Sequence, residues 1–448
     1  MLIFIALLSL VILLCVCIWH IEYSLAVFMP IIMLLPNTIK IFEVNVQHLA
    51  LIIVIIGLYL KRKKTKELLQ GCDKTFTMYA IGIAFLSFLS MCLLQYMTIS
   101  QFLSHLIRFM LDIVIIGCLL NHYILQTKAI YVFDTSLYVT TAIVCLYAFY
   151  NYFSHSNPYM AYVTIITNAE VDMSNDFQET IRGALQGRVS STFVHPLILG
   201  QCILLVTSYI IYELKDKKIL IKWLVISVLF IVSFLTGSRS SLIPIIVSIA
   251  IYIFSLNGTV RRKNMLIAAI LLTIALIFTP KSYKETISNM VFENAESKYK
   301  QIGGIGGSSL ELRQQQLESA VSILGSDIFI GRGNGYVTTY GQRHSTDMLG
   351  YESIIFRELF DNGIIGLILF FLFYGILYIK LLRYAHTKRN KYRVHSLCLS
   401  FLISGILTGI QYGMITFYIL FYMITIHNIY EEEKTNNVKL NICYFKYA

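Results

Sequence analysis

The chain has 448 residues, of which 57% are hydrophobic and only 14% charged, and its mean hydropathy is +0.69. Soluble domains are about 45–50% apolar and about 25% charged, so this composition excludes an ordinary soluble enzyme and predicts a membrane protein. The net charge of +11 does not indicate nucleic-acid binding, because the basic residues lie in short clusters between apolar runs rather than on one folded surface.

The first apolar run, MLIFIALLSLVILLCVCIW, has no basic region before it and no small-residue cleavage site. We therefore expect a retained membrane span rather than a removable signal. The nine cysteines lie mostly within apolar segments, so no disulfide framework is predicted. No Cys/His cluster has metal-ligand spacing, so we predict neither a metal nor another cofactor.

Apolar runs of about 20 residues recur along the chain, and inside a bilayer such runs must be helical because their backbone groups find no water to bond. We predict an all-α polytopic membrane protein with about 12–13 transmembrane helices and a large helical extracytoplasmic loop. The short second run ends at Pro36, which leaves the count at 12 or 13. The predicted spans are 1–19, 22–37, 41–60, 75–96, 100–121, 129–152, 195–212, 218–236, 239–257, 264–280, 353–382, 394–410 and 412–429.

The orientation follows from four clusters rich in Lys and Arg, at 61–66, 213–218, 261–263 and 380–393. Such clusters stay on the cytoplasmic side of a membrane. The number of predicted spans between consecutive clusters is even, so all four fall on one side without conflict. The two long polar segments then lie on the outer face of a bacterial plasma membrane.

This topology divides the chain into five parts. They are N-terminal transmembrane helices (1–152), a first outer loop (153–194), central transmembrane helices (195–280), a large outer loop (281–352), and C-terminal transmembrane helices with a cytoplasmic tail (353–448). The large loop holds eight acidic and seven basic residues, and such a near-neutral segment suits translocation across the membrane.

The large loop has the features of a folded structure. Ser308 stands three residues before Glu311 in a capping-box pattern, apolar residues then recur at helical spacing, and Gly325 ends the predicted helix. The following GRGNGY sequence places Gly331 and Gly333 at alternate positions, which allows backbone to approach another chain or a ligand closely. It lacks the GK[ST] ending of a phosphate loop, and a simple turn is the alternative interpretation.

Three of the arginines on the predicted outer side, where the positive-inside bias makes arginine scarce, are Arg188, Arg239 and Arg313. An arginine binds phosphate oxygens with a planar, two-pronged geometry, so the three suit a pyrophosphate group at the membrane surface. The alternative for each is a side chain that anchors in lipid headgroups. His195 and Pro196 begin the next predicted span, and proline fits the first turn of a helix.

The order of these features resembles the bacterial O-antigen ligase and polysaccharide polymerase family of membrane glycosyltransferases, over roughly residues 185–375. The shared features are Arg188 followed by His195-Pro196, GSRSS at an outer turn, an arginine on a loop helix, the Gly-x-Gly stretch and DNGIIGLILFF. The resemblance implies a cavity capped by the outer loop, and transfer of a sugar chain from polyprenyl pyrophosphate to an acceptor sugar hydroxyl without metal. It implies that Arg188 and Arg313 bind the pyrophosphate, that Arg239 is the family's turn arginine, and that His195, Pro196, Gly331 and Gly333 support the site.

The chain departs from the family where a ligase typically carries His-Asn, since Glu352 stands at that histidine position. A carboxylate can also remove the proton from an attacking hydroxyl, so Glu352 is the predicted base and His344 the second candidate. The alternative for Glu352 is an ordinary acidic residue at a helix N-terminus. The substitution favours a polymerase of O-antigen, capsule or exopolysaccharide over a ligase that transfers the chain to a lipid acceptor.

Two other classes compete with this interpretation. A flippase for lipid-linked sugars would use ionisable residues within the membrane, and the span at 100–121 holds His105, Arg108 and Asp112. A structural ion pair explains Arg108 and Asp112 more simply, and the long loop at 281–352 argues against a flippase. A peptidoglycan-type polymerase would use an outer-loop aspartate such as Asp327. Expected partners are the lipid-linked oligosaccharide, the acceptor chain and the bilayer, with a chain-length regulator and a flippase, and no nucleic acid.

Overall fold

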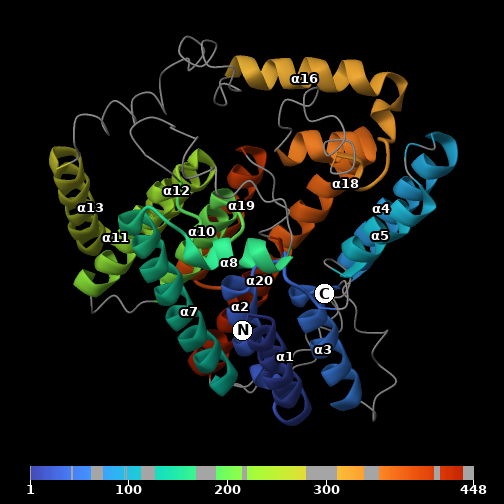
Figure 1. Ribbon diagram of the computed structural model, residues 1–448. Coiled ribbons are helices and arrows are strands. Elements are labelled where there is room, and N and C mark those ends of the chain that lie inside the picture. The colour runs from blue at the N-terminus through green and yellow to red at the C-terminus, as the bar shows by residue number, and fades with distance from the viewer. Residues whose placement is uncertain are drawn as a thin grey trace.

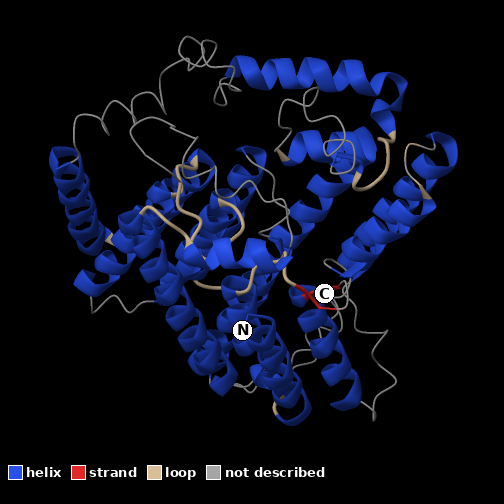
Figure 2. Ribbon diagram, in the orientation of Figure 1, coloured by secondary structure: helices blue, strands red, loops and turns tan. Residues whose placement is uncertain are grey.

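The structure is a computed structural model, and it is almost entirely helical (Figure 2). It describes residues 2–41, 44–61, 74–94, 96, 98–111, 127–167, 188–213, 219–278, 310–337, 353–407 and 414–436. The helices are α1 (Leu2–Trp19), η1 (Ile21–Tyr23), α2 (Ser24–Leu34), α3 (Val46–Lys61), α4 (Lys74–Leu94), α5 (Ile99–Met110), α7 (Thr127–Ser154), α8 (Pro158–Thr167), α10 (Pro196–Glu213), α11 (Ile219–Leu235), α12 (Arg239–Ser255), α13 (Gly258–Phe278), α16 (Leu310–Leu324), η4 (Gly325–Phe329), α18 (Ile354–Arg383), α19 (Lys388–Leu407) and α20 (Met414–Asn436).

The prediction of an all-α polytopic membrane protein is confirmed, and every predicted span contains a helix. Five helices are long and apolar enough to cross a bilayer by length and composition: α1, α4, α7, α10 and α18. The predicted loop helix is also present as α16, which lies across the top of the bundle above α18 (Figure 1).

Three local features differ from the sequence-based expectation. The predicted span at 41–60 begins only at Val46, because β1 (Lys40–Ile41) and β2 (Val44–Asn45) first form a short antiparallel hairpin. The first outer loop contains a helix, α8, that hydropathy did not predict. The predicted span at 353–382 is broken inside α18 at Gly363, which has φ of +66° and ψ of −169°. A residue with a side chain adopts that backbone conformation only with strain.

Helix α10 lies at the centre of the bundle and is buried over most of its length. Its neighbours approach closely because the facing residues are small. A Cβ placed on Gly200 would lie 2.7 Å from the Ser241 hydroxyl of α12. Ser248 of α12 donates a hydrogen bond to Ser208 of α10 at 3.1 Å, and it also bonds Ser396 of α19. Small and hydroxyl-bearing side chains at such contacts are typical of helix packing within membranes.

A buried cluster of charges joins four helices where they approach the predicted cytoplasmic side. Arg393 of α19 is 1% exposed and pairs with Glu213 at the end of α10. His427 of α20 faces Glu213 at 3.5 Å and Asp134 of α7 at 3.4 Å, and Tyr209 donates to Asp134 at 2.7 Å. Buried charges are tolerated only when they are paired in this way, so the cluster fixes how these helices pack.

Candidate functional site

The structure brings Arg188 against the GSRSS turn, as the prediction of a shared outer site requires. Arg188 is only 5% exposed, and its Nε atom donates to the carbonyl oxygen of Thr236 at 2.8 Å. The backbone N–H of Val189 donates to Leu235 at 3.1 Å, so the segment before α10 runs alongside the end of α11. Gly237 has φ of +62° and lies under the aliphatic part of the Arg188 side chain. Arg239 follows as the first residue of α12.

The GSRSS turn is rich in buried hydroxyl groups. Ser238 and Ser240 are hydrogen-bonded at 2.8 Å, and Ser233 donates to Ser241 at 2.9 Å. Ser238 is the N-cap residue of α12, but its side chain forms no capping hydrogen bond. The N-terminus of a helix carries partial positive charge on its first N–H groups, and here a buried guanidinium lies beside it. This end of α12 is therefore suited to an anion.

His195 and Pro196 support the site by shaping the start of α10. The Nδ1 atom of His195 accepts a hydrogen bond from the N–H of Leu197 at 3.1 Å, and its carbonyl oxygen accepts from Leu199 at 3.3 Å. Pro196 is the first residue of the helix, where a missing N–H costs nothing. His195 thus caps α10 through its side chain, and its role as a supporting residue of the substrate site stays a prediction.

The GRGNGY segment (331–336) contacts the break in α18. A Cβ placed on Gly331 would lie 2.6 Å from the backbone nitrogen of Asn362, and one placed on Gly363 would lie 2.6 Å from the nitrogen of Gly331. The N–H of Arg332 donates to Phe360 and that of Gly333 to Asp361, both at 2.8 Å. The close backbone approach predicted for these glycines therefore occurs, and its partner among the described residues is α18.

Asp361 joins this segment to the cationic side of the site. Its carboxylate is 2% exposed and accepts hydrogen bonds from the N–H groups of Gly335 and Val337, both at 3.0 Å. It also lies 3.6 Å from Nε of Arg357, one helical turn earlier. Asp361 thus holds the loop backbone and orients the Arg357 guanidinium together.

Asp327, considered as the aspartate of a peptidoglycan-type polymerase, is occupied by structural contacts. Its carboxylate accepts from Arg332 Nε at 3.2 Å and from the Tyr96 hydroxyl at 3.1 Å. The Arg332 guanidinium stacks over the Tyr96 ring at 4.3 Å and donates to Tyr336 at 2.8 Å. Partial burial, together with the hydrogen bond to Asp327, raises the pKa of Tyr96. These contacts fasten the end of α16 and η4 onto the connection between α4 and α5.

A cavity of about 340 Å³ lies next to Asp361 and Arg357, between the α2–α3 hairpin, α5, α10, α18 and the start of α20. Its cationic end carries two guanidinium groups, those of Arg108 of α5 and Arg357 of α18, and His105 of α5 also lines the cavity. Glu358 and Asn362 complete this end, and the Asn362 amide donates to the Glu358 carboxylate at 2.9 Å. A cavity of this size with a few convergent polar groups has the character of a ligand site.

The other surfaces of the cavity are neutral. The α2–α3 hairpin contributes polar residues, and neighbouring helices contribute apolar and aromatic ones. The polar residues are Asn37, Asn45, Gln47 and His48, and the apolar ones include Ile32, Leu35, Phe109, Phe193 and Ile198. The lining therefore includes a charged set, here called the charged or cationic end (Arg108, Arg357 and Glu358), and a polar set on the α2–α3 hairpin without guanidinium or carboxylate groups, here called the neutral end, together with apolar surface.

The cavity lies at the ends of helices opposite to the basic clusters. In α3, His48 is near the beginning and Lys61 is the last residue. In α18, Arg357 is near the beginning, whereas Lys380 and Arg383 are in the last turn. The cavity therefore opens at the ends that the loop charges predict to be extracytoplasmic.

Sequence reasoning missed Arg357 and Glu358. Both lie in the first turns of the apolar segment that begins α18, in the sequence IIFRELFDNG. Ionisable residues are costly within membrane segments and tend to mark functional sites, so this adjacent pair was the available signal. Arg108, interpreted from the sequence as half of an ion pair, is one of the residues that line the cavity. Asp112 is outside the described residues, and its pairing with Arg108 stays a prediction.

Several predicted residues lie outside what the structure describes. Glu352 and His344, the candidate bases, are outside the described residues altogether. Arg313 is in α16 and Arg239 begins α12, but their side chains are also outside the description. The roles predicted for these four residues therefore stay predictions.

Within the described parts of the chain, three potential metal ligands come together in one place. Ligand atoms of Asp134, Glu213 and His427 lie within 4.8 Å of one another. Arg393 pairs with Glu213 in the same cluster, so a cation is already present. None of these residues lines the 340 Å³ cavity. The three residues lie far apart in the sequence, so their proximity could not be predicted from it.

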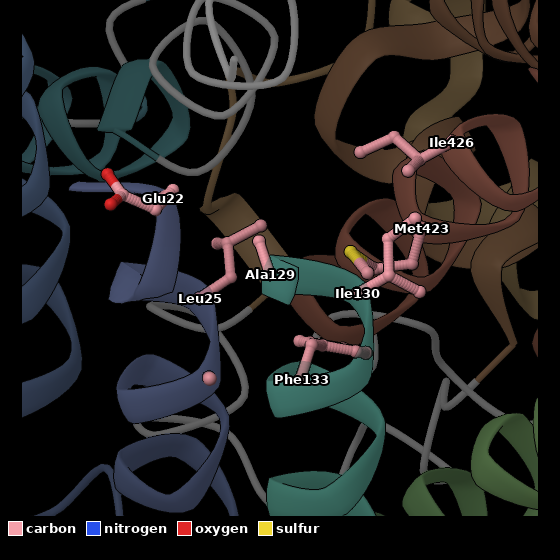
Figure 3. Close-up of a pocket in the computed structure, with 8 residues that line it drawn as sticks. Glu22, Leu25, Ala129, Ile130, Phe133, Met423 and Ile426 are labelled. Atoms are coloured by element: carbon pink, nitrogen blue, oxygen red, sulfur yellow. The ribbon is translucent and has the colours of Figure 1, made fainter. Parts of the chain in front are cut away.

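A second pocket lies between α2, α7 and α20 (Figure 3). Its volume is only about 10 Å³, and its lining is apolar except for Glu22. The labelled side chains, among them Leu25, Phe133 and Met423, fill the space between the helices (Figure 3). This pocket is a packing gap with no arrangement of polar groups for chemistry.

Comparison with known proteins agrees with the sequence and the geometry. Residues 224–371 match a family model described as O-antigen ligase. A search of curated proteins gave no match for the chain. The matched region runs from α11 into α18 and includes the GSRSS turn, α16, the GRGNGY segment, Arg357 and Glu358. These 148 of the 448 residues are therefore similar to the O-antigen ligase family, whose members are membrane glycosyltransferase-like enzymes.

Proposed function

We propose that the protein is a metal-independent polysaccharide polymerase. It joins oligosaccharide repeat units carried on polyprenyl pyrophosphate, at the outer face of a bacterial plasma membrane. The observation that carries this proposal is the 340 Å³ cavity whose charged end combines Arg357 and Glu358 of the O-antigen ligase region with Arg108 of α5. A multi-pass membrane enzyme of this family acts on lipid-linked oligosaccharide, and the cavity offers the groups that such a substrate needs.

The cationic end of the cavity suits the pyrophosphate. Arg108 and Arg357 line it, and the Asp361 carboxylate lies 3.6 Å from the Arg357 guanidinium and orients it. Arg188, Arg239 and Arg313 are proposed to bind the same pyrophosphate as the chain leaves the membrane. Charge that develops on a leaving group is stabilised most strongly by donors that are already in place, and the bonds of Arg188 and Arg357 keep them there.

The reaction is a displacement at the sugar C1 carbon. The acceptor hydroxyl oxygen forms a bond to C1 while the C1–O bond to pyrophosphate breaks. The hydroxyl proton passes to a carboxylate. The pyrophosphate, still attached to its polyprenyl carrier, leaves with the electron pair of the broken bond. Glu358 lines the cavity and is the base candidate among the described residues, while Glu352 keeps the role that the family position gives it.

A polymerase is preferred to a ligase because Glu352 replaces the histidine that ligases typically carry. The acceptor in a polymerase is a further sugar chain, and a cavity with a neutral polar end offers room for one. In a cell, a flippase that delivers the lipid-linked units and a chain-length regulator are the expected partners.

The test is chain growth by the purified full-length protein in lipid vesicles with lipid-linked repeat units. We expect a ladder of longer products from the native protein and from Arg262→Ala, an exposed arginine in the predicted cytoplasmic cluster 261–263. Arg357→Ala and the double variant Arg188→Ala/Arg313→Ala should each abolish the ladder. Undiminished growth with both would reject the proposal.

The choice between polymerase and ligase is made in a deletion strain. Loss of a polymerase leaves single repeat units on the final anchor. Loss of a ligase leaves long chains that remain unattached. The first profile is expected, and the second would assign the ligase function instead.

A further inference from the structure

The neutral end of the cavity is formed by a part of the chain outside the matched family region. Residues Asn37, Asn45, Gln47 and His48, here called the amide wall, belong to the α2–α3 hairpin. The O-antigen ligase match begins only at residue 224. The cavity thus combines Arg357, Glu358 and Asn362 of the matched region with residues from outside it, among them Arg108 and the amide wall.

The amide wall is held firmly by bonds that do not use Asn37 or Asn45. The Gln47 amide donates to Ile32 at 3.4 Å and to Leu35 at 3.3 Å, which closes the turn after α2. The N–H of Ile39 donates to Pro36 at 3.1 Å and that of Val46 to Ile39 at 3.0 Å. These bonds fix the hairpin before any ligand arrives, which lowers the entropic cost of binding.

Two neighbouring elements anchor the same hairpin from outside. The Tyr159 hydroxyl of α8 donates to the carbonyl oxygen of Leu34 at 2.7 Å. The Thr192 hydroxyl, a few residues after Arg188, donates to Met33 at 2.6 Å. The amide wall is therefore anchored to the segment before α10, which also carries Arg188. This segment helps to position both the amide wall and Arg188.

Asn37 and Asn45 present amide groups to the cavity. To the rest of the described chain, their side chains form no hydrogen bond. Each amide carries two N–H donors and a carbonyl acceptor, the same set of partners that sugar hydroxyl and acetamido groups require. Phe109 and Phe193 add aromatic surface beside them. A phosphate or a carboxylate would instead be drawn to Arg108 and Arg357.

We infer that the amide wall is the subsite for the acceptor, and that it takes an uncharged sugar bearing hydroxyl or acetamido groups at the growing end of the chain. This inference rests on the proposed function, since the donor pyrophosphate is assigned to Arg108 and Arg357. Its consequence is that the amide wall determines which sugar is extended, whereas the charged residues of the cavity serve the transfer. Asn37 and Asn45 are specificity-determining residues in this scheme.

The test uses the full-length protein in lipid vesicles and repeat-unit oligosaccharide freed from its lipid by mild acid as the acceptor probe. Asn37→Ala/Asn45→Ala should raise the acceptor concentration at half-maximal transfer about tenfold or more, because one lost hydrogen bond weakens binding by roughly fivefold. The maximal rate and the half-saturating concentration of lipid-linked donor should change less than twofold. Asn257→Ala, which removes an exposed amide between α12 and α13, is the matched control and should behave like the native protein.

A direct titration of the freed oligosaccharide, measured by calorimetry without donor, separates the two proposals. If Arg357→Ala abolishes transfer but still binds the oligosaccharide, and the asparagine variant does not bind it, both proposals stand. If Arg357→Ala and Arg188→Ala/Arg313→Ala both transfer normally, the proposed function fails, yet the titration still tests the wall. Native acceptor binding by the double variant overturns the inference. Asn45→Asp, nearly identical in shape, provides a second variant if the double variant does not fold, and it should lower acceptor affinity in the same way.

Discussion

The guanidinium of Arg188 and the carbonyl oxygen of Thr236 are hydrogen-bonded at 2.8 Å, although 48 residues separate them. This bond fastens the segment before α10 to the turn before α12, and it fixes the direction of the other guanidinium nitrogens. Since α12 begins within this turn, the bond also sets Arg188 beside the N-terminus of that helix. The hydrogen bond thus links two segments of the chain and also orients the Arg188 guanidinium.

Replacing Arg188 by lysine should therefore be costly even though the charge is kept. A lysine has one compact donor head, and it cannot bond Thr236 and present a planar pair of N–H groups to a pyrophosphate at once. We expect the initial rate of chain growth to fall about 10²-fold, on the order of the loss of one donor to a developing anion. Arg262→Lys should leave the rate unchanged, and a fully active Arg188→Lys would mean that positive charge alone suffices.

Gly331→Ala tests the contact between the GRGNGY segment and α18. Gly331 has φ of +70°, and its Cβ would meet the backbone of Asn362 and Gly363. Gly325 also has a positive φ of +50°, but open space surrounds it. Gly325→Ala should cost about 1–2 kcal/mol for its left-handed conformation. Gly331→Ala should lower the melting temperature of the purified protein much further, and equal effects would contradict the described contact.

Asp361→Asn tests whether one carboxylate organises both the loop and Arg357. An asparagine keeps one acceptor oxygen, so one of the two bonds to Gly335 and Val337 is lost, together with the charge facing Arg357. We expect a loss of about 1–3 kcal/mol of stability and a lower rate of chain growth. Ser90→Ala, which removes only a bond to the Gly331 carbonyl oxygen, should cost less and leave the rate nearly unchanged.

Arg393→Met tests the buried charge cluster. The substitution removes the guanidinium that pairs with Glu213 and leaves the two carboxylates beside His427 and the Tyr209 hydroxyl, and an uncompensated buried charge typically costs about 3–5 kcal/mol. The double variant Arg393→Met/Glu213→Gln removes both charges of the pair and should regain much of this loss. Thermal unfolding of the detergent-solubilised protein measures both effects. A double variant that is no more stable than the single one would argue that Arg393 acts through packing instead.

Removal of divalent metals should leave chain growth intact. Among the described residues, the one group of three potential ligands contains Asp134, Glu213 and His427, and it lies outside the cavity. Dialysis against EDTA should therefore not change the rate by more than about twofold. A loss of activity that is restored by one added metal would refute the metal-independent mechanism.

The helical architecture was predictable because apolar length alone dictates a helix in a membrane. Loop charge also predicts that Arg188 and the GSRSS turn lie on the outer side, and this placement stays a prediction. Their hydrogen bond across 48 residues could not be predicted, because no local pattern records which distant carbonyl a buried arginine reaches.

The break of α18 and the cavity were beyond sequence reasoning for a different reason. Hydropathy treats IIFRELFDNGIIG as the start of one continuous span, and it cannot detect a glycine whose conformation is imposed by another segment. Arg357 and Glu358 were likewise overlooked as minor interruptions of an apolar run. The amide wall depends on a hairpin whose two strands have only two residues each, and strands this short produce no periodic sequence signal.

The joint between Gly331 and Gly363 is made by backbone atoms on both sides. A contact of this kind places few constraints on the identity of the surrounding side chains, because nearly every residue offers the same backbone N–H and carbonyl groups. Related proteins can therefore diverge widely in sequence and still assemble the same junction, provided that glycines remain at these two points. Glycine spacing is therefore the feature by which distant relatives should be sought.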